Sequence, residues 1–483
     1  MPLILPGNVA SATAGAYSIQ NSCRFNGSSQ GLVRTNPSSS PTLGTKSTVS
    51  FWSKRTEPNS TGTNQFFQYT NGGSSPYNQM YWKSTGHFQW QNHDTTTNTS
   101  LITNQKFMDC SAWYHMVFSY DSTPSTPSSS SVKMFVNGVQ VTSFSDETYP
   151  SQNVVSQVCK PSVNFPIGYY PSTAWYSGYY AELMVVDGQA LNAYSFGEFD
   201  SDSPTIWKPI DISGINVGNL GCYLEFKDSA ELGVDTSGVG NFTETALTAV
   251  NQSTDTPTNN FCVINPLDNY YAGSTISQGN CKIVGHASRS SYNTGTIGLS
   301  AGKWYWEIKQ GVVAGTGSEY YAHVGIETIP STSTSNSAGI NTYSSNYSSY
   351  DGDHYHDTGG SGNNDDFGDT YTDGDIISVA LDLDNNKVYY AKNGTWQNSQ
   401  DPTDGTNALT ITAPASTDSG VYFPAIGDRT AAKYYTWEAN FGGCPAFTVS
   451  SSNADDNGYG NFEYDVPAGY LAICTKNLGS DGG

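Results

Sequence analysis

The sequence predicts an all-β protein in which two antiparallel β-sandwich (jelly-roll) domains follow one another. Strand-like alternation of apolar and polar residues recurs in both halves of the chain. Hydrophobic residues make up only 36%, yet there are 33 Tyr, 10 Trp and 49 Gly, which indicates aromatic-rich β cores with many turns. A length of 483 residues is enough for two or three domains with their own cores. We therefore expect very little helix.

The clearest local pattern is a predicted hairpin between Gly374 and Gly394. Alternate positions are apolar from Ile377 to Leu383, as expected of a half-buried strand. The DNN sequence at 384–386 then supplies a turn, after which the alternation resumes. Asn393 and Gly394 provide the positive φ angles of a second, tight turn. The pattern predicts two strands and two turns.

Motifs on both sides of this hairpin resemble the successive strands of a SPRY domain. In chain order they are GKWYWEI (302–308), HVGI (323–326), YFPA (422–425), NFG (440–442) and PAGY (467–470). We place this SPRY-like domain at 261–475, about 200 residues, as expected of one all-β domain. The resemblance implies a bent antiparallel sandwich that recognises partners through its rim loops and is not a catalyst.

A second set of strands occupies residues 21–200 and resembles the LamG-like group of concanavalin-type jelly rolls. The motifs, in order, are SFWSK, WYHMVFSYD, VKMFVNGVQV and GYYAELMVVDGQAL. The third contains Asn137-Gly138, a strong hairpin signal. The resemblance implies two curved antiparallel sheets whose concave side and edge loops often bind carbohydrate.

Residues 201–260 are turn-rich and are expected to bridge the two domains. One strand is predicted around Tyr223, Leu224 and Phe226, and it could join either sandwich. The run FGEFDSDS with DTPTNNF is similar to marine bacteriophage structural proteins that combine LamG-like and SPRY-like domains. The opening LILPGNV and the closing VPAGYLAICTKNL look like the two ends of such proteins, with 476–483 as a flexible tail.

This resemblance implies a virion protein, a tail fibre or head-attached fibre that adheres to a glycan or protein on the host surface. Its other partners would be virion proteins of capsid or tail, and a homo-oligomer is compatible with the sequence. A purely structural decoration protein of capsid or tail is the alternative, and a glycan depolymerase is a third. Retaining glycanases need two close carboxylates, but neither Glu198/Asp200 nor Glu463/Asp465 is followed by the second Glu of E-x-D-x-x-E. We expect no enzyme activity and no catalytic residue.

Charge and composition exclude several other classes of partner. The net charge of −22 repels phosphate, so nucleic-acid binding is not expected. No apolar run approaches the length of a membrane span, so membrane insertion is not expected either. The eight cysteines are thinly spread without a C-x-x-C pair, which favours buried thiols over disulfides.

Two clusters of aromatic residues in turn-rich sequence are candidate ligand-binding sites. Exposed rings can cover the C–H face of a sugar while neighbouring Asn, Ser and Asp side chains bind its hydroxyls. The alternative is that these rings fill sheet surfaces, which we expect for the strand residues Tyr179 and Tyr180. The candidate ligand-binding residues are Tyr343, Tyr347, Tyr350, Tyr355, Trp175 and Tyr176.

An acidic stretch is a candidate metal site. Between Asp351 and Asp384 there are ten Asp and no Lys or Arg, and the run DGDHYHD contains two histidines. Carboxylate-rich loops with Gly suit calcium as a cofactor, while His-x-His with Asp suits a transition metal. A solvated acidic loop that protects a sheet edge is the alternative. The candidate ligands are Asp351, Asp353, His354, His356 and Asp357.

The first 20 residues form an apolar lead segment. Pro2 and Pro6 bracket Leu3, Ile4 and Leu5 and disfavour a helix there. This segment is expected to pair either with the edge of its own sheet or with a partner's sheet. In the second case these three residues would anchor the protein to the virion.

Overall fold

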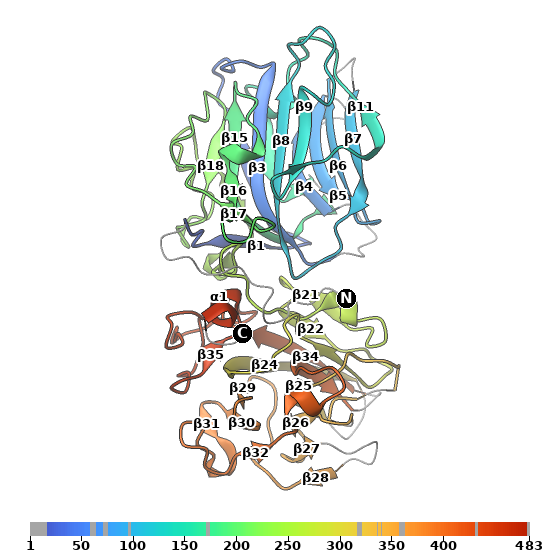
Figure 1. Ribbon diagram of the computed structural model, residues 1–483, viewed down its shortest axis with the longest axis vertical. Helices are drawn as coiled ribbons and strands as arrows, with labels where there is room; N and C mark the ends of the chain where they lie inside the picture. The colour runs from blue at the N-terminus through green and yellow to red at the C-terminus, as the bar shows by residue number, and fades with distance from the viewer. Residues whose placement is uncertain are drawn as a thin grey trace. The chain divides into compact units, whose positions relative to one another are not determined.

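The structure of the chain is a computed structural model, shown in Figure 1. It describes residues 17–57, 64–70, 76–94, 98–170, 174–315, 321–335, 337–339, 341–356, 363–429 and 433–480. The predicted anchor residues Leu3, Ile4 and Leu5 lie outside these ranges, as does Asp357. The chain divides into two compact units with the boundary between Thr258 and Asn259, and each has its own sheets and core.

The first unit contains two large antiparallel sheets that form a sandwich. One follows the order β10-β9-β8-β3-β15-β1-β20, and β18 pairs with β15 outside this path. Its strands are β1 (Ser22–Asn26), β3 (Lys46–Arg55), β8 (Trp113–Asp121), β9 (Val132–Val136), β10 (Val139–Gln140), β15 (Ser177–Asp187), β18 (Cys222–Leu224) and β20 (Gln252–Ser253).

The other sheet of the first unit follows the order β11-β7-β6-β5-β4-β12-β2-β19. Its strands are β2 (Gly31–Thr35), β4 (Asn64–Thr70), β5 (Tyr77–Trp82), β6 (His87–His93), β7 (Asn98–Lys106), β11 (Phe144–Thr148), β12 (Asn164–Ile167) and β19 (Thr243–Thr245). Two small ribbons complete the unit, β13 (Tyr169–Tyr170) with β14 (Ala174–Trp175) and β16 (Gly197–Phe199) with β17 (Trp207–Pro209).

Aromatic side chains from both sheets form the first core. Phe118 of β8 lies 5.3 Å from Trp90 of β6, ring centre to ring centre, and 5.9 Å from Phe51 of β3. Tyr179 and Tyr180 are fully buried, as expected for strand residues. The Asn137-Gly138 turn joins β9 to β10 with φ angles of 46° and 79°, which confirms the predicted hairpin.

The expected bridging segment is largely part of the first unit. Residues 201–258 supply β18, β19 and β20, which pair with β15, β2 and β1. The side chain of Asp255 reaches the buried amine of Lys54 at 2.8 Å. The strand predicted around Tyr223 and Leu224 is β18, and it joins the first sandwich. The strands β19 and β20 were not predicted, because two or three residues carry little alternation and their partners lie far away along the chain.

The second unit also contains two antiparallel sheets. The larger follows the order β21-β22-β34-β24-β29-β30-β31, with β32 beside β30 and β35 parallel to β24. Its strands are β21 (Thr275–Ser277), β22 (Lys282–Val284), β24 (Lys303–Gly315), β29 (Ile376–Asp382), β30 (Lys387–Lys392), β31 (Thr395–Trp396), β32 (Leu409–Thr410), β34 (Lys433–Asn440) and β35 (Leu471–Ala472).

The smaller sheet of the second unit follows the order β23-β33-β25-β26-β27-β28. Its strands are β23 (Ser291–Thr294), β25 (Ala322–Glu327), β26 (Ser345–Ser348), β27 (His354–His356), β28 (Asn363–Asp365) and β33 (Phe423–Asp428). Among the described residues the α-helical structure is α1 (Thr475–Ser480), and short 3-10 turns lie at η1 (Gln157–Cys159), η2 (Ala193–Ser195), η3 (Ala249–Asn251), η4 (Pro266–Asp268), η5 (Gln397–Ser399) and η6 (Pro414–Ser416).

The predicted hairpin is present as β29 and β30, followed by β31 after the Asn393-Gly394 turn. The expectation that its first strand is half-buried is wrong, because β29 is buried on both faces. Ala380, on the face expected to be exposed, packs in a second apolar cluster with Tyr305 and Tyr389. Residues near the C-terminus, including Phe462 and Tyr470, complete that cluster. The alternation itself is correct, but a distant segment covers its polar side.

Candidate functional site

Aromatic rings and one guanidinium group gather where neighbouring strands of the smaller sheet in the second unit end. Tyr321 precedes β25, Arg429 follows β33, Tyr350 follows β26 and Tyr355 lies on β27. The Arg429 guanidinium lies 5.1 Å from the ring centre of Tyr355 and 5.8 Å from that of Tyr321. The rings of Tyr321 and Tyr350 are 4.9 Å apart. We call these four residues the rim patch.

The rim patch presents an accessible ring next to a positive charge. Tyr350 is 42% exposed, whereas Tyr355 is only 3% exposed and serves mainly as support. The Tyr355 hydroxyl donates a hydrogen bond to Asp351 Oδ2 at 2.7 Å, which fixes the ring under Arg429. Because guanidinium and phenol groups can both stack and donate hydrogen bonds, this surface suits a polar ligand with flat or ring-shaped faces.

Several of the predicted ligand-binding rings are not accessible. Tyr347 and Tyr176 are fully buried in the two cores, so the expectation that they are exposed is wrong, as it is for Tyr355. Turn-rich sequence surrounds Tyr347 and Tyr176, but each lies on or beside a strand and belongs to a core. Tyr355 lies on the opposite face of its sheet from Tyr347, next to the Arg429 guanidinium. Tyr343 is partly buried with a φ of 68°, and Trp175 is partly buried and stacks on Tyr169 at 5.0 Å. Whether the accessible rings bind a ligand stays a prediction.

The predicted metal ligands separate into two groups. His354 and His356 lie on one face of β27, and their ligand atoms come within 4.8 Å of a carboxylate oxygen of Asp365 on β28. Asp365 is not among the metal ligands predicted from the sequence, because it lies nine residues from His356. A hairpin after the HYH strand is the signal that could have identified it, since it places Asp365 directly opposite His354.

Asp351 and Asp353 turn away from the two histidines toward other partners. Asp351 accepts the Tyr355 hydroxyl, and Asp353 Oδ2 accepts a hydrogen bond from the Asn364 side chain. Burial lowers the pKa of His354 to about 3, so this imidazole is neutral at physiological pH. The described group therefore consists of two imidazoles and one carboxylate.

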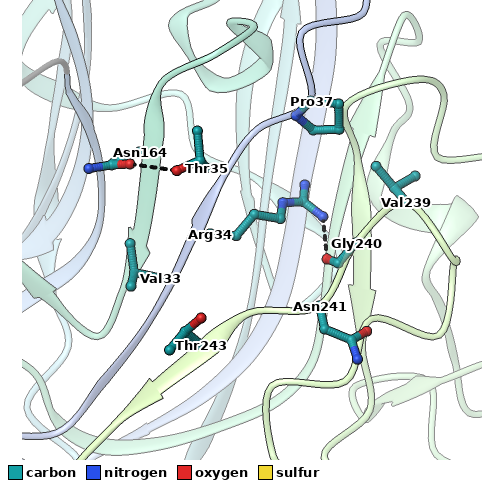
Figure 2. Close-up of a pocket in the computed structure, with 9 residues that line it drawn as sticks. All are labelled: Val33, Arg34, Thr35, Pro37, Asn164, Val239, Gly240, Asn241 and Thr243. Atoms are coloured by element: carbon teal, nitrogen blue, oxygen red, sulfur yellow. Dashed lines mark hydrogen bonds between the residues drawn. The ribbon is translucent and has the colours of Figure 1, made fainter.

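A pocket of about 350 Å³ lies in the first unit, on the outer face of the sheet that contains β2, β12 and β19 (Figure 2). Thr35 Oγ1 donates to Asn164 Oδ1 across it at 2.9 Å. The lining residues are Val33, Arg34, Thr35, Pro37, Asn164, Val239, Gly240, Asn241 and Thr243. Hydroxyl and carboxamide groups of Thr35, Asn164, Asn241 and Thr243 share this surface with the apolar side chains of Val33, Pro37 and Val239.

The Arg34 guanidinium beside this pocket does not form an anion site. An arginine has five N–H donors, and all five are used within the protein. The acceptors are Asn36 Oδ1, Asp235 Oδ2 and the carbonyl oxygens of Gly240, Leu220 and Gly221, at 2.9–3.3 Å. Figure 2 shows the bond to Gly240. The pocket therefore suits a neutral, hydroxyl-bearing ligand better than an anionic one.

Carboxylates of the two acidic pairs that were compared with a glycanase motif form ion pairs or hydrogen bonds within the protein. Glu198 and Asp200 lie 3.3 Å and 3.5 Å from the amine of Lys208. Glu463 accepts hydrogen bonds from the backbone and side chain of Ser450 at 2.6 Å and 2.5 Å. The cysteine side chains that the structure describes are buried and form no disulfide with one another, namely Cys23, Cys110, Cys222, Cys262, Cys281, Cys444 and Cys474.

These features define the class of the protein as a tandem of antiparallel β-sandwich domains. Residues 26–193 match the model of the Concanavalin A-like lectin/glucanases superfamily, and residues 303–442 match the SPRY domain model. The chain thus carries a LamG-like concanavalin-type domain followed by a SPRY domain, which confirms the predicted fold class and order. No curated protein matches the chain.

The solved structures that match the chain include proteins from animals. The SPRY domain of human HERC1 is 14% identical, with 36% of this chain and 96% of that chain covered and a TM-score of 0.28. A SAP-like pentraxin from Limulus polyphemus is 18% identical, with 37% and 80% covered and a TM-score of 0.27. Domains LG4-5 of the mouse laminin alpha1 chain are 11% identical, with 89% and 92% covered and a TM-score of 0.28.

Within the described ranges, none of the helices is long and apolar enough to cross a membrane.

Proposed function

We propose that this chain is a non-enzymatic bacteriophage virion protein, a tail fibre or head-attached fibre, that adheres to a glycan or protein on the host surface. The observation that carries the adhesive role is the pairing of a concanavalin-type domain with a SPRY domain. The virion role rests on the resemblance of the segment around 196–203 and of both chain ends to phage structural proteins.

Two surface features support binding as the task of these domains. In the rim patch, the ring of Tyr321 contacts both the exposed ring of Tyr350 and the guanidinium of Arg429. The pocket of the first unit offers neutral hydroxyl and carboxamide groups, because Arg34 is saturated by internal acceptors. Both surfaces suit a sugar, which combines apolar C–H faces with many hydroxyl groups.

Binding to whole cells tests the adhesive role. Purified protein should adsorb to cells of its host without the other virion proteins, because those proteins would contact other surfaces of the chain. Tyr350→Ala should weaken adsorption by about 1 kcal/mol, roughly fivefold in Kd, because one stacking ring is lost. Arg429→Ala should weaken it as well, since Tyr321 and Tyr355 lose the cation that lies over them.

The matched control is Tyr270→Ala, which removes a ring that is 84% exposed elsewhere in the same domain. Adsorption unchanged in Tyr350→Ala and Arg429→Ala would remove the rim patch from the proposal. No adsorption by the wild-type protein to any cell of a marine bacterial panel would favour the purely structural decoration role. Release of reducing ends from surface polysaccharide, abolished by changing one acid, would instead identify a depolymerase.

A further inference from the structure

Strand pairing, rather than sequence proximity, brings two histidines and one aspartate together in the SPRY domain. His354 pairs with Asp365 across the β27–β28 ladder, and His356 lies two residues further along the same face. His356 Nε2 is 2.9 Å from Asp365 Oδ2, and the two imidazole rings stack at 4.7 Å with an angle of 13° between their planes. One nitrogen or oxygen atom from each residue falls within a span of 4.8 Å.

A chain of hydrogen bonds fixes which nitrogen of His354 carries the proton. The Tyr390 hydroxyl donates its single proton to the Ser345 carbonyl oxygen at 2.8 Å. The 3.2 Å contact between Ser345 Oγ and the Tyr390 hydroxyl must then use the proton of Ser345. Ser345 Oγ therefore accepts from His354 Nε2 at 2.8 Å. This is the only assignment that gives each contact one proton, and it leaves Nδ1 of His354 with an unprotonated lone pair.

An oriented imidazole of this kind is typical of metal-ligating histidines. Such a histidine usually donates its second N–H to a fixed acceptor, which sets the tautomer and the direction of the ring. Here Ser345 is the acceptor, and Tyr390 holds Ser345 in turn. His354 also packs 6.0 Å from Phe367, ring centre to ring centre, on its buried side. The inner ligand is thus held rigidly.

The outer two ligands can adjust to an ion. The side chains of His356 and Asp365 are 32% and 74% exposed. Tetrahedral coordination at about 2.0–2.1 Å places ligand atoms roughly 3.4 Å apart, so shifts of about 1 Å would close the group around an ion. The overall charge of −22 also raises the concentration of cations near the surface.

We propose that His354, His356 and Asp365 bind a divalent transition-metal ion such as Zn²⁺, with at least one coordination position left to water or to a ligand. Two imidazoles and one carboxylate suit zinc and related metals, whereas calcium prefers six to eight oxygen ligands. The bound ion links β27 to β28. It thereby stabilises the strand whose opposite face carries Tyr355 of the rim patch.

Titration of the untagged full-length protein with ZnCl₂, after removal of metal by EDTA and dialysis, tests this site by calorimetry. We expect one equivalent of Zn²⁺ to bind and the melting temperature to rise with zinc concentration, because the ion binds only the folded state. His356→Ala and Asp365→Asn should each weaken binding by at least about tenfold. Both residues are exposed enough that these variants should keep their fold, which circular dichroism checks.

The control is His286→Ala, which removes a partly exposed histidine elsewhere in the same domain and should leave zinc binding unchanged. Cobalt provides a second readout, since Co²⁺ at this site should show visible absorption that His356→Ala loses. Absence of stoichiometric zinc binding by the wild-type protein would overturn the proposal. Equal binding by wild type, His356→Ala and Asp365→Asn would overturn it as well.

Discussion

The carboxylate of Glu327 is a buried ionisable group that is held by several hydrogen bonds. In the SPRY domain, Glu327 is fully buried on β25 and accepts bonds from the Gly339 backbone and from the side chains of Asn341 and Asn346, at 2.9–3.1 Å. Burial nevertheless raises the pKa of Glu327 to about 7, because the donors only partly offset the loss of solvation. A buried acid of this kind makes stability depend on pH.

We predict that Glu327→Gln reduces the pH dependence of the free energy of unfolding. The pKa of Glu327 is about 7 in the folded protein and about 4.5 in the unfolded chain. Its stabilising contribution is therefore complete below pH 4.5 and is lost as the pH rises through 7. Urea unfolding measures the free energy of unfolding at pH 5 and at pH 8. The decrease of this free energy between the two pH values should be larger in the wild type than in the variant by roughly 3 kcal/mol. Glu231→Gln, at an exposed position, should leave the dependence unchanged; an unchanged dependence in Glu327→Gln would contradict the prediction.

Among the elements, the β29–β31 region contains two turn glycines that differ in the packing around them. Gly394 has a φ of 78° in the turn between β30 and β31, and a Cβ atom there would lie 2.6 Å from the Tyr464 ring. Gly374, just before β29, has a φ of 91° but no atom within 4 Å of such a Cβ. The two positions separate backbone strain from steric contact.

Alanine at these two glycines should therefore have different effects on stability. Gly374→Ala should lower the free energy of unfolding by about 1 kcal/mol, the strain of a positive φ in a residue with a side chain. Gly394→Ala should lower it by more, because the Tyr464 ring must also move. Chemical denaturation of both variants measures the difference. Equal losses of the free energy of unfolding would show that the Tyr464 ring moves without destabilising the domain.

At the scale of the whole molecule, the end of the LamG-like domain is set by long-range ion pairs. Arg34 pairs with Asp235 at 2.9 Å and Lys54 with Asp255 at 2.8 Å, and all four side chains are at most 3% exposed. Trp113 Nε1 also donates to Asp255 Oδ1 at 3.0 Å. Both aspartates lie beyond residue 200, so the first domain needs the segment that follows it.

Two truncated chains test where this domain ends. Residues 17–258 should fold and unfold cooperatively, whereas residues 17–200 should not form a stable domain. The shorter chain lacks β18, β19 and β20 and leaves Arg34 and Lys54 buried without their carboxylates. Each unpaired charge costs about 3–5 kcal/mol, which together approach the entire stability of a domain. A cooperative thermal transition in 17–200 would contradict this boundary.

The fold class, the order of the two domains and the main hairpins could be predicted from the amino-acid sequence. Those features depend on local information, namely the alternation of apolar residues and turn residues such as Asn137-Gly138 and Asn393-Gly394. Strand motifs of ten or so residues also suffice to place the two sandwiches. The register of β29 and β30 follows from the same local pattern.

The accessibility of these residues and the pairing of acids with bases depend instead on tertiary packing. Alternation assigns a side chain to a face, but a distant segment can cover that face, as Phe462 covers Ala380. For the same reason Tyr347 is in the core while Tyr350, three residues on, is exposed. Asp365 reaches His356, 9 positions away, because β27 pairs with β28. Asp235 reaches Arg34, 201 positions away, from the segment between β18 and β19. A local hairpin pattern could have indicated the first of these contacts, but no local pattern encodes the contact of Asp235 with Arg34, because it depends on the packing of the whole domain.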